Sequence, residues 1–228
     1  MAQIFFNGKL LPTASKRYVA FVDIMGIQTH MLKSTATAAN FIFKLHSAIL
    51  DAWRNEKYQN VFVYPVMDGA YITAAKKSDI EKIVVRIFKG IAEIQITESN
   101  PSHWFIIRGS IAFGEVIHGH HVPYAASKVF EKDLGYKNNI LLGPAMISAY
   151  RGEEKAAPFG IYLDDSAINQ ESGRGFSENW KWYGSTALTL DSEIGTKIRR
   201  TVLDYFEKTS GDTKADQHKQ LAEEYFSL

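Results

Sequence analysis

The chain has 228 residues, of which 46% are hydrophobic and 22% are charged, and its formal net charge is +1. This composition fits a globular domain and lacks the basic field that a nucleic-acid-binding protein needs. The absence of cysteine excludes disulfides, thiolate metal sites and a cysteine nucleophile. No apolar run approaches the ~20 residues that span a membrane. We therefore expect a cytoplasmic protein that binds neither nucleic acid nor membrane.

The first half of the chain alternates strand patterns with a helical pattern. Residues 18–23 (YVAFVD) form a short apolar run that ends in an acid, which is typical of a buried strand. Residues 41–54 place apolar side chains at helical spacing. Two further strand patterns, 61–66 and 70–75, flank residues 67–69, where an Asp-Gly pair predicts a hairpin turn.

The middle of the chain repeats the helix-then-strand order. Residues 78–81 form a capping box, and an apolar helical face follows it to Ile91. A long strand pattern covers 105–117. A short apolar run at 140–142 then precedes a helix that opens with Gly-Pro at position 143.

The last part of the chain adds one strand pattern at 159–163, a Gly/Ser-rich loop at 171–177, and helical patterns at 192–208 and 213–226. The order β–α–β–β–α–β, followed by a further helix and strand, predicts an α+β fold of the ferredoxin-like type. Such a fold has an antiparallel sheet with helices on one face. We expect one domain over residues 1–228, with its core at about 18–165 and a C-terminal helical extension at about 190–228. The extension is expected to pack on the core or on a partner.

Two aspartates support a functional prediction. Asp23 closes the first strand and Asp68 lies in the hairpin turn, so a ferredoxin-like sheet can bring both to one end. Two close carboxylates repel each other and resist ionisation, and a divalent cation with hard oxygen ligands resolves that conflict. Gly26, just beyond the strand, lets backbone N–H groups approach phosphates. Taken alone, each aspartate is more often an ordinary strand end or turn residue, and it is their joint placement in this fold pattern that favours a functional role.

Four motifs, in this order, resemble those of class III adenylate and guanylate cyclase catalytic domains over about residues 18–165. They are FVDIMG at 21–26, MDGA at 67–70, RGSIAFGEV at 108–116 and GPAMISAYR at 143–151. The second motif departs from the family, because Met67 stands where a glycine is usual.

The resemblance implies a two-metal enzyme that makes a cyclic nucleotide from a nucleoside triphosphate. Two Mn²⁺ or Mg²⁺ ions per active site would be held by Asp23, Asp68 and the carbonyl of Ile24. Arg151 matches the arginine that stabilises the triphosphate, although a solvated helix end is an equal reading of that residue. Nucleotide binding is implied for Phe21, Gly26, Ile27, Tyr64 and Arg151. The resemblance also implies a homodimer with its active sites between the chains.

Three positions depart from the purine cyclases. Tyr64 occupies the position where purine cyclases have the lysine that reads adenine, and Ile140 occupies the position of the second, polar base-reading residue. Ile147 occupies the position of the asparagine that orients the ribose. These departures resemble the pyrimidine cyclases of bacterial Pycsar antiphage systems, whose product acts on a separate cyclic-nucleotide-gated effector. The resemblance implies conversion of UTP to cyclic UMP. CTP remains an alternative substrate, and Tyr64 is also compatible with simple packing on its sheet face.

Two other interpretations are weighed against this one. Ile147 favours a degenerate cyclase-like domain that only binds a nucleotide or a partner, whereas the pair Asp23 and Asp68 favours an enzyme. The histidines in residues 118–121 (HGHH) have no carboxylate at metal-ligand spacing. We expect them to lie in an exposed loop that plays no part in the chemistry.

Overall fold

The computed structural model describes residues 6–55, 58, 60–169, 178–209 and 213–227. The loop expected at residues 171–177 lies outside the described residues. The strands are β1 (Ser15–Ile24), β2 (Val61–Val66), β3 (Gly69–Ala74), β4 (Ile107–His118), β5 (Leu141–Leu142), β6 (Ile161–Leu163) and β7 (Asn179–Trp180). The helices are α1 (Ile27–Lys33), α2 (Thr35–Arg54), α3 (Lys77–Thr97), α4 (Leu134–Asn138), α5 (Pro144–Glu153), α6 (Asp165–Ile168), α7 (Ile194–Thr209) and α8 (Thr213–Phe226).

The strands form one mixed sheet in the order β2-β3-β1-β4-β6-β7, and β5 pairs with the far end of β4. The central strands β2, β3, β1 and β4 are antiparallel, which is the ferredoxin-like order expected from the sequence. The sheet is mixed and not purely antiparallel, because β6 runs parallel to β4 after the crossover through α5.

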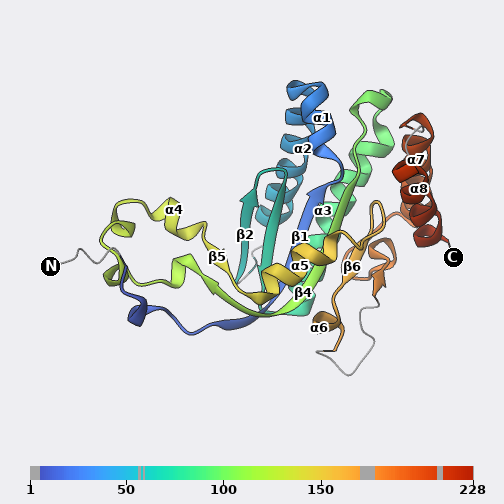
Figure 1. The fold of residues 1–228 in the computed structure, drawn as a ribbon. Coiled ribbons are helices and arrows are strands. Elements are labelled where there is room, and N and C mark those ends of the chain that lie inside the picture. The colour runs from blue at the N-terminus through green and yellow to red at the C-terminus, as the bar shows by residue number, and fades with distance from the viewer. Residues whose placement is uncertain (1–5, 56–57, 59, 170–177, 210–212, 228) are drawn as a thin grey trace.

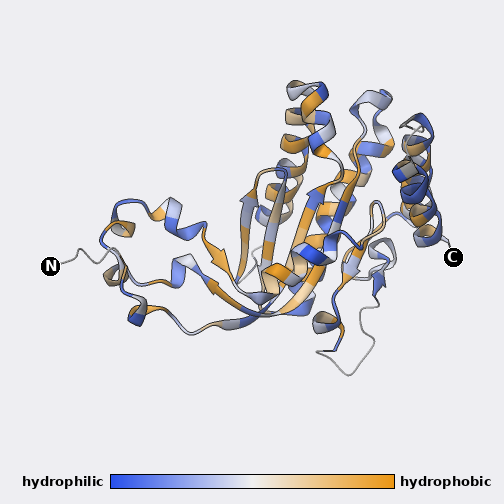
Figure 2. Cartoon of the chain, viewed as in Figure 1, coloured by the Kyte–Doolittle hydropathy of each residue, from blue (hydrophilic) through white to orange (hydrophobic). Residues whose placement is uncertain are grey.

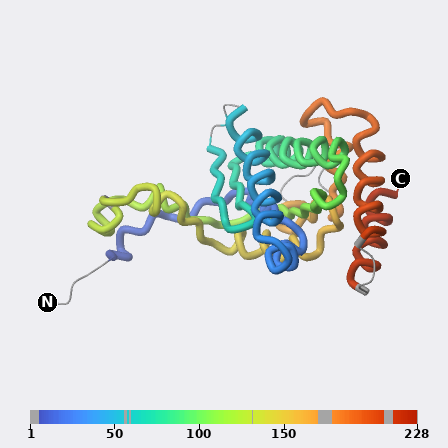
Figure 3. The backbone as a smooth tube through the Cα atoms, turned by 90° about the horizontal axis from the view of Figure 1, so that it is seen from above, coloured from blue at the N-terminus to red at the C-terminus, as the bar shows by residue number. Residues whose placement is uncertain are grey.

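Helices cover both faces of the sheet, whereas the sequence predicted helices on one face. Helices α2 and α3 lie on one side and α5 on the other (Figures 1 and 3). The reason is visible in β1, where successive side chains point to opposite faces and both faces are buried. Ala20 and Val22 belong to the larger core, and Val19 and Phe21 belong to a second cluster under α5.

The C-terminal helices α7 and α8 pack on the domain core. Ile198 and Val202 of α7 are fully buried in the same cluster as the central strands. The Tyr225 hydroxyl of α8 donates a hydrogen bond to the Trp180 carbonyl at 2.6 Å. Figure 2 shows that the remaining surface of both helices is largely hydrophilic. Within the part of the chain that the structure describes, every helix is too short or too polar to cross a membrane.

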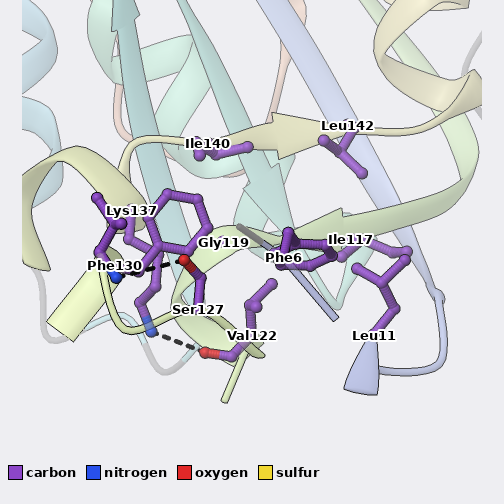
Figure 4. Close-up of a pocket in the computed structure, with 11 residues that line it drawn as sticks. Phe6, Leu11, Ile117, Gly119, Val122, Ser127, Phe130, Lys137, Ile140 and Leu142 are labelled. Carbon is purple, nitrogen blue, oxygen red and sulfur yellow. Dashed lines mark hydrogen bonds between the residues drawn. The ribbon is translucent and has the colours of Figure 1, made fainter. Parts of the chain in front are cut away.

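An arm extends from the sheet on the side opposite α7 and α8 (Figures 1 and 3). It consists of residues 6–14 and 119–140, tied together by a hydrogen bond from Asn7 N to the Ala126 carbonyl at 2.8 Å. The arm encloses a cavity of about 530 Å³ with an almost wholly apolar lining (Figure 4). Lys137 is buried in its wall, where the ammonium donates to the Val122 carbonyl at 2.8 Å and lies 4.4 Å over the Tyr124 ring.

Candidate functional site

The structure places Asp23 and Asp68 at the same end of the sheet. Asp23 is the penultimate residue of β1, and its register partners are Gly69 on β3 and Arg108 on β4. Asp68 lies in the turn between β2 and β3, immediately before Gly69. The hairpin is as predicted, but its two turn residues are Met67 and Asp68, and Gly69 is already the first residue of β3. Met67 has a positive φ of 39° at the position where the family has glycine.

Glycine is the only residue type that fits at position 69 of the sheet. A Cβ atom there would lie 2.4 Å from the Val22 carbonyl oxygen and 3.0 Å from Oδ1 of Asp23. The first distance is shorter than a carbon–oxygen contact allows and involves backbone, and the second is tight, so any side chain would push β3 away from β1. The glycine therefore allows the hairpin turn to approach the Asp23 carboxylate closely.

The Asp23 carboxylate is in an unfavourable environment for its charge. Burial, then the charges of Asp68 and Glu153, raise its pKa to about 7, against a backbone hydrogen bond from Ile24 and the charge of Arg108. Its Oδ1 atom is buried and has no hydrogen-bond partner among the described residues. A buried oxygen of this kind needs a partner, and a cation would supply one.

The donor set at this end of the sheet fits Mg²⁺ or Mn²⁺ bound together with a nucleotide. Such ions are usually held by one or two carboxylates plus substrate phosphates. No group of three or more acidic or histidine side chains that could hold a metal occurs in the described ranges. The oxygens of Asp23, Asp68 and the Ile24 backbone would thus form an incomplete shell, which the nucleotide would complete.

An ion pair next to Asp23 was missed by the sequence analysis. Arg108 Nε lies 2.6 Å from Oε1 of Glu153, the last residue of α5, and both side chains are largely buried. Burial raises the pKa of Glu153 and the charge of Arg108 lowers it, with the balance upward. Glu153 follows Arg151 at a helix end, where a charged residue is normally solvated. A signal for it was the charge of Arg108 in the first half of β4, where the other residues are uncharged.

The other predicted nucleotide-binding residues lie close to this end of the sheet or on the face under α5. Gly26 has a φ of 70° and precedes α1, so it supplies the turn out of β1. Ile27 is buried, which leaves its backbone as the group that can meet a ligand. The Phe21 ring packs against Tyr71 and Tyr150, with centroid distances of 4.7 and 5.4 Å.

Arg151 lies in the last turn of α5 with an exposed side chain. Within the described residues it has no ion pair with Asp23 or Asp68. Ile147 and Tyr150, on the same helix, are 52% and 54% exposed. This part of α5 therefore presents apolar and cationic groups to the outside of the chain.

Tyr64 is 3% exposed, and its hydroxyl lies 2.5 Å from Nδ1 of His118. His118 is the fully buried last residue of β4, whereas the sequence predicted an exposed loop. The difference arises because β4 extends to residue 118 and the imidazole of His118 contacts the Tyr64 side chain. Burial first, then the charge of His120, lowers the pKa of His118 to about 3. Burial also raises the pKa of Tyr64. The Tyr64 hydroxyl thus already has a neutral partner.

This arrangement of strands and helices, with two aspartates at the end of β1 and in the β2–β3 turn, is the fold of class III nucleotidyl cyclase catalytic domains. A monomeric guanylyl cyclase domain of the RhoGC fusion protein from the aquatic fungus Blastocladiella emersonii aligns with a TM-score of 0.51. Its sequence identity is 16%, over 68% of this chain and 84% of that chain. A bacterial light-regulated adenylyl cyclase aligns with a TM-score of 0.49 and 16% identity, over 63% of this chain and 41% of that chain. The fold assignment rests on the first alignment. No protein-family model matches the sequence, and no curated protein matches it.

Proposed function

We propose that the chain is a nucleotidyl cyclase, a single domain over residues 1–228, that converts UTP to cyclic UMP and pyrophosphate. The observation that carries the proposal is the pair Asp23 and Asp68 at one sheet end, where a buried oxygen of Asp23 has no hydrogen-bond partner among the residues that the structure describes. A domain that only bound a partner would gain nothing from two carboxylates whose ionisation is opposed by burial and by each other.

In the proposed reaction, the ribose O3′ forms a bond to the α-phosphorus. The bond from the α-phosphorus to the bridging oxygen breaks, pyrophosphate leaves, and the hydroxyl proton goes to solvent. When bound, two divalent cations would lower the pKa of the 3′-hydroxyl and neutralise the triphosphate. Asp23, Asp68 and the Ile24 carbonyl would hold those ions. The backbone N–H groups at Gly26 and Ile27 would orient the phosphates.

The second part of the proposal is a homodimer with its sites between the chains. It is supported by the exposed apolar groups of α5, Ile147 and Tyr150, beside Arg151. Arg151 of one copy would meet the phosphates held by the other copy. Asp23→Ala and Arg151→Ala should each be inactive alone, and an equimolar mixture should regain activity through mixed dimers. If the mixture stays inactive, the shared site is wrong.

The choice of a pyrimidine rests on the two positions that read the base in the purine cyclases that this sequence resembles. Tyr64 lacks the ammonium group that reads adenine, and its hydroxyl is bonded to His118. Ile140, at the position of the second base reader, lines the apolar arm cavity. Neither residue offers the polar pair that selects a purine. UTP is our first choice, CTP is the alternative, and we propose that the product acts on a separate effector in antiphage defence.

A second candidate function is a degenerate domain that binds a nucleotide without turning it over. It is favoured by Ile147, which is 52% exposed and offers no hydrogen bond at the position where cyclases orient the ribose. The two functions differ in one readout, because only the enzyme releases pyrophosphate.

The test is to incubate the purified protein with Mn²⁺ and each of ATP, GTP, CTP and UTP, and to separate the products by mass. Cyclic UMP from UTP alone is the expected result. Cyclic CMP would keep the mechanism and change the substrate. Cyclic AMP or cyclic GMP would contradict the pyrimidine assignment. Nucleotide binding without any product would support the degenerate domain.

A further inference from the structure

A second hollow, of about 470 Å³, lies between the segment after β1 and the C-terminal helices. We call it the basic pocket. Its lining includes five nitrogen-bearing side chains: His30, Lys33, Arg108, Lys214 and His218. The described lining contains no aspartate or glutamate. Lys33 and Lys214 give this lining its positive charge, because Arg108 is ion-paired with Glu153 and burial lowers the pKa of His30. A concave surface with a positive charge attracts anions.

Contacts of α7 with the core, with α8 and with α1 hold the walls of the pocket. His30 Nε2 of α1 lies 3.4 Å from the Tyr205 hydroxyl of α7. The rings of Phe206 on α7 and His218 on α8 stack with centroids 6.2 Å apart. Ile198 and Val202 anchor α7 in the domain core. Cations held on a packed framework lose little freedom when an anion binds.

The basic pocket is also continuous with the proposed active site. Met25 and Gly26, which follow Asp23, form part of its wall. Arg108, another wall residue, is the register partner of Asp23 on the neighbouring strand. Burial lowers the pKa of His30, and the positive charge of Lys33 lowers it further. The basic side chains of the pocket therefore repel one another when both are charged. An anion between them would relieve that repulsion.

We propose that the basic pocket binds a multiply charged phosphate anion, with Lys33 of α1 and Lys214 of α8 as its main contacts. The anion is either the pyrophosphate end of the nucleotide or a separate phosphorylated ligand. The first source rests on the proposed cyclase function, whereas the anion site itself does not. The C-terminal helices would then supply part of the phosphate-binding surface, in addition to packing on the core.

The experiment is calorimetric titration of the full-length protein with inorganic pyrophosphate in metal-free buffer at low salt. The test variant is Lys33→Ala with Lys214→Ala. The matched control is Lys9→Ala with Lys128→Ala, which removes two exposed lysines outside the pocket lining. We expect saturable binding by the unchanged protein and the control, and binding at least about tenfold weaker in the test variant. Lys33→Arg with Lys214→Arg should restore most of the affinity.

No binding by the unchanged protein, or equal weakening in both double variants, would overturn the proposal. Thermal melts of all variants check that each one folds. Asp68→Ala, which removes the proposed chemistry, should bind pyrophosphate unchanged, so the anion site can hold even if the cyclase assignment fails. Competition with a non-hydrolysable UTP analogue separates the sources. One-for-one displacement indicates the nucleotide, and simultaneous binding of both indicates a separate ligand.

Discussion

The two ends of β4 lie in regions of opposite character. At the start of β4, Arg108 forms an ion pair with Glu153 and lies opposite Asp23 on the neighbouring strand β1. Arg108 also borders the basic pocket. At its last residue, His118 is neutral, bonded to Tyr64, and followed by the arm with its apolar cavity. One strand therefore joins a charged region to an apolar one.

The two hollows in these regions have similar volumes, about 470 Å³ for the basic pocket and about 530 Å³ for the arm cavity. A buried charged group in each region differs in its hydrogen bonding. The Lys137 ammonium in the arm is paired with a carbonyl, whereas Asp23 Oδ1 beside the basic pocket has no hydrogen-bond partner in the described part of the chain. The two regions thus differ in charge and not in cavity volume, and buried atoms without a hydrogen-bond partner in the described residues occur in both, since Nε2 of His118 and Nε2 of His120 are of this kind too. We call the Asp23 region, which holds the proposed active site, the reactive end.

The variant Asp68→Ala should have the largest effect and gives the strongest test of the difference between the Asp23 region and the arm. Without this carboxylate the proposed metal seat loses half of its side-chain ligands, so we expect cyclase activity to fall by about a thousandfold or more. Turnover measured as pyrophosphate release is the readout. Asp133→Asn in the arm is the matched control, because asparagine keeps the cap on α4 while removing one acid. Equal losses in both variants would contradict the assignment of the reactive end.

Gly69→Ala should destabilise the reactive end through the backbone. The new Cβ atom would lie 2.4 Å from the Val22 carbonyl oxygen, and we expect a loss of about 3 kcal/mol in the free energy of unfolding. Urea denaturation measures the loss. Gly8→Ala in the arm has no atom within 4 Å of its added Cβ, and it should change stability by less than about 0.5 kcal/mol.

Lysines in the two regions should also behave differently. Lys137→Met leaves the Val122 carbonyl buried without its donor, so we expect a loss of about 2 kcal/mol in unfolding free energy. Lys33→Met, on the exposed rim of the basic pocket, should change stability by less than about 0.5 kcal/mol while weakening pyrophosphate binding. Denaturation and calorimetry on the same two variants check both halves. Two similar stability losses would remove the contrast.

The smallest effect concerns the pH dependence of the His118 end. The folded pKa of about 3 lies below the ordinary value of 6.5, so below pH 6.5 the unfolded chain binds a proton that the folded chain excludes. Stability should therefore fall as pH drops, by about 1 kcal/mol between pH 6 and 5 from this residue. His118→Gln should remove that part of the slope in urea denaturation. Above pH 7 both proteins should show the same slope.

Sequence periodicity predicted most of this fold, because the central strands and long helices have strong patterns. The order of strands and the hairpin at Asp68 are as expected, and α7 and α8 lie within two residues of their predicted ranges. The position of α5 was not predictable from its own pattern. It depends on β1 burying both of its faces, which a short apolar run does not reveal.

The site was predictable where a residue type and its place in the fold act together. The meeting of Asp23 and Asp68 at one end of the sheet was predicted because strand order brings a strand end and a turn together, and their role in binding metal stays a prediction. Glu153 was missed because its burial depends on Arg108, which is 45 positions earlier in the chain. The basic pocket was missed for a similar reason, since its lining combines Lys33 of α1 with Lys214 of α8, which lie far apart in the sequence.

The length of β4 has a mechanical consequence. Its twelve residues extend over roughly 35–40 Å at the usual rise of a strand, and hydrogen bonds tie it to β1, β5 and β6. Pairing with β1 covers most of the length of β4, whereas β6 and β5 pair only near its two ends on the other edge, so the amides bonded to β1 should be among the slowest of the described residues to exchange with deuterium. Because β4 connects the arm to the sheet, any force applied to the arm would be transmitted to the sheet through this strand.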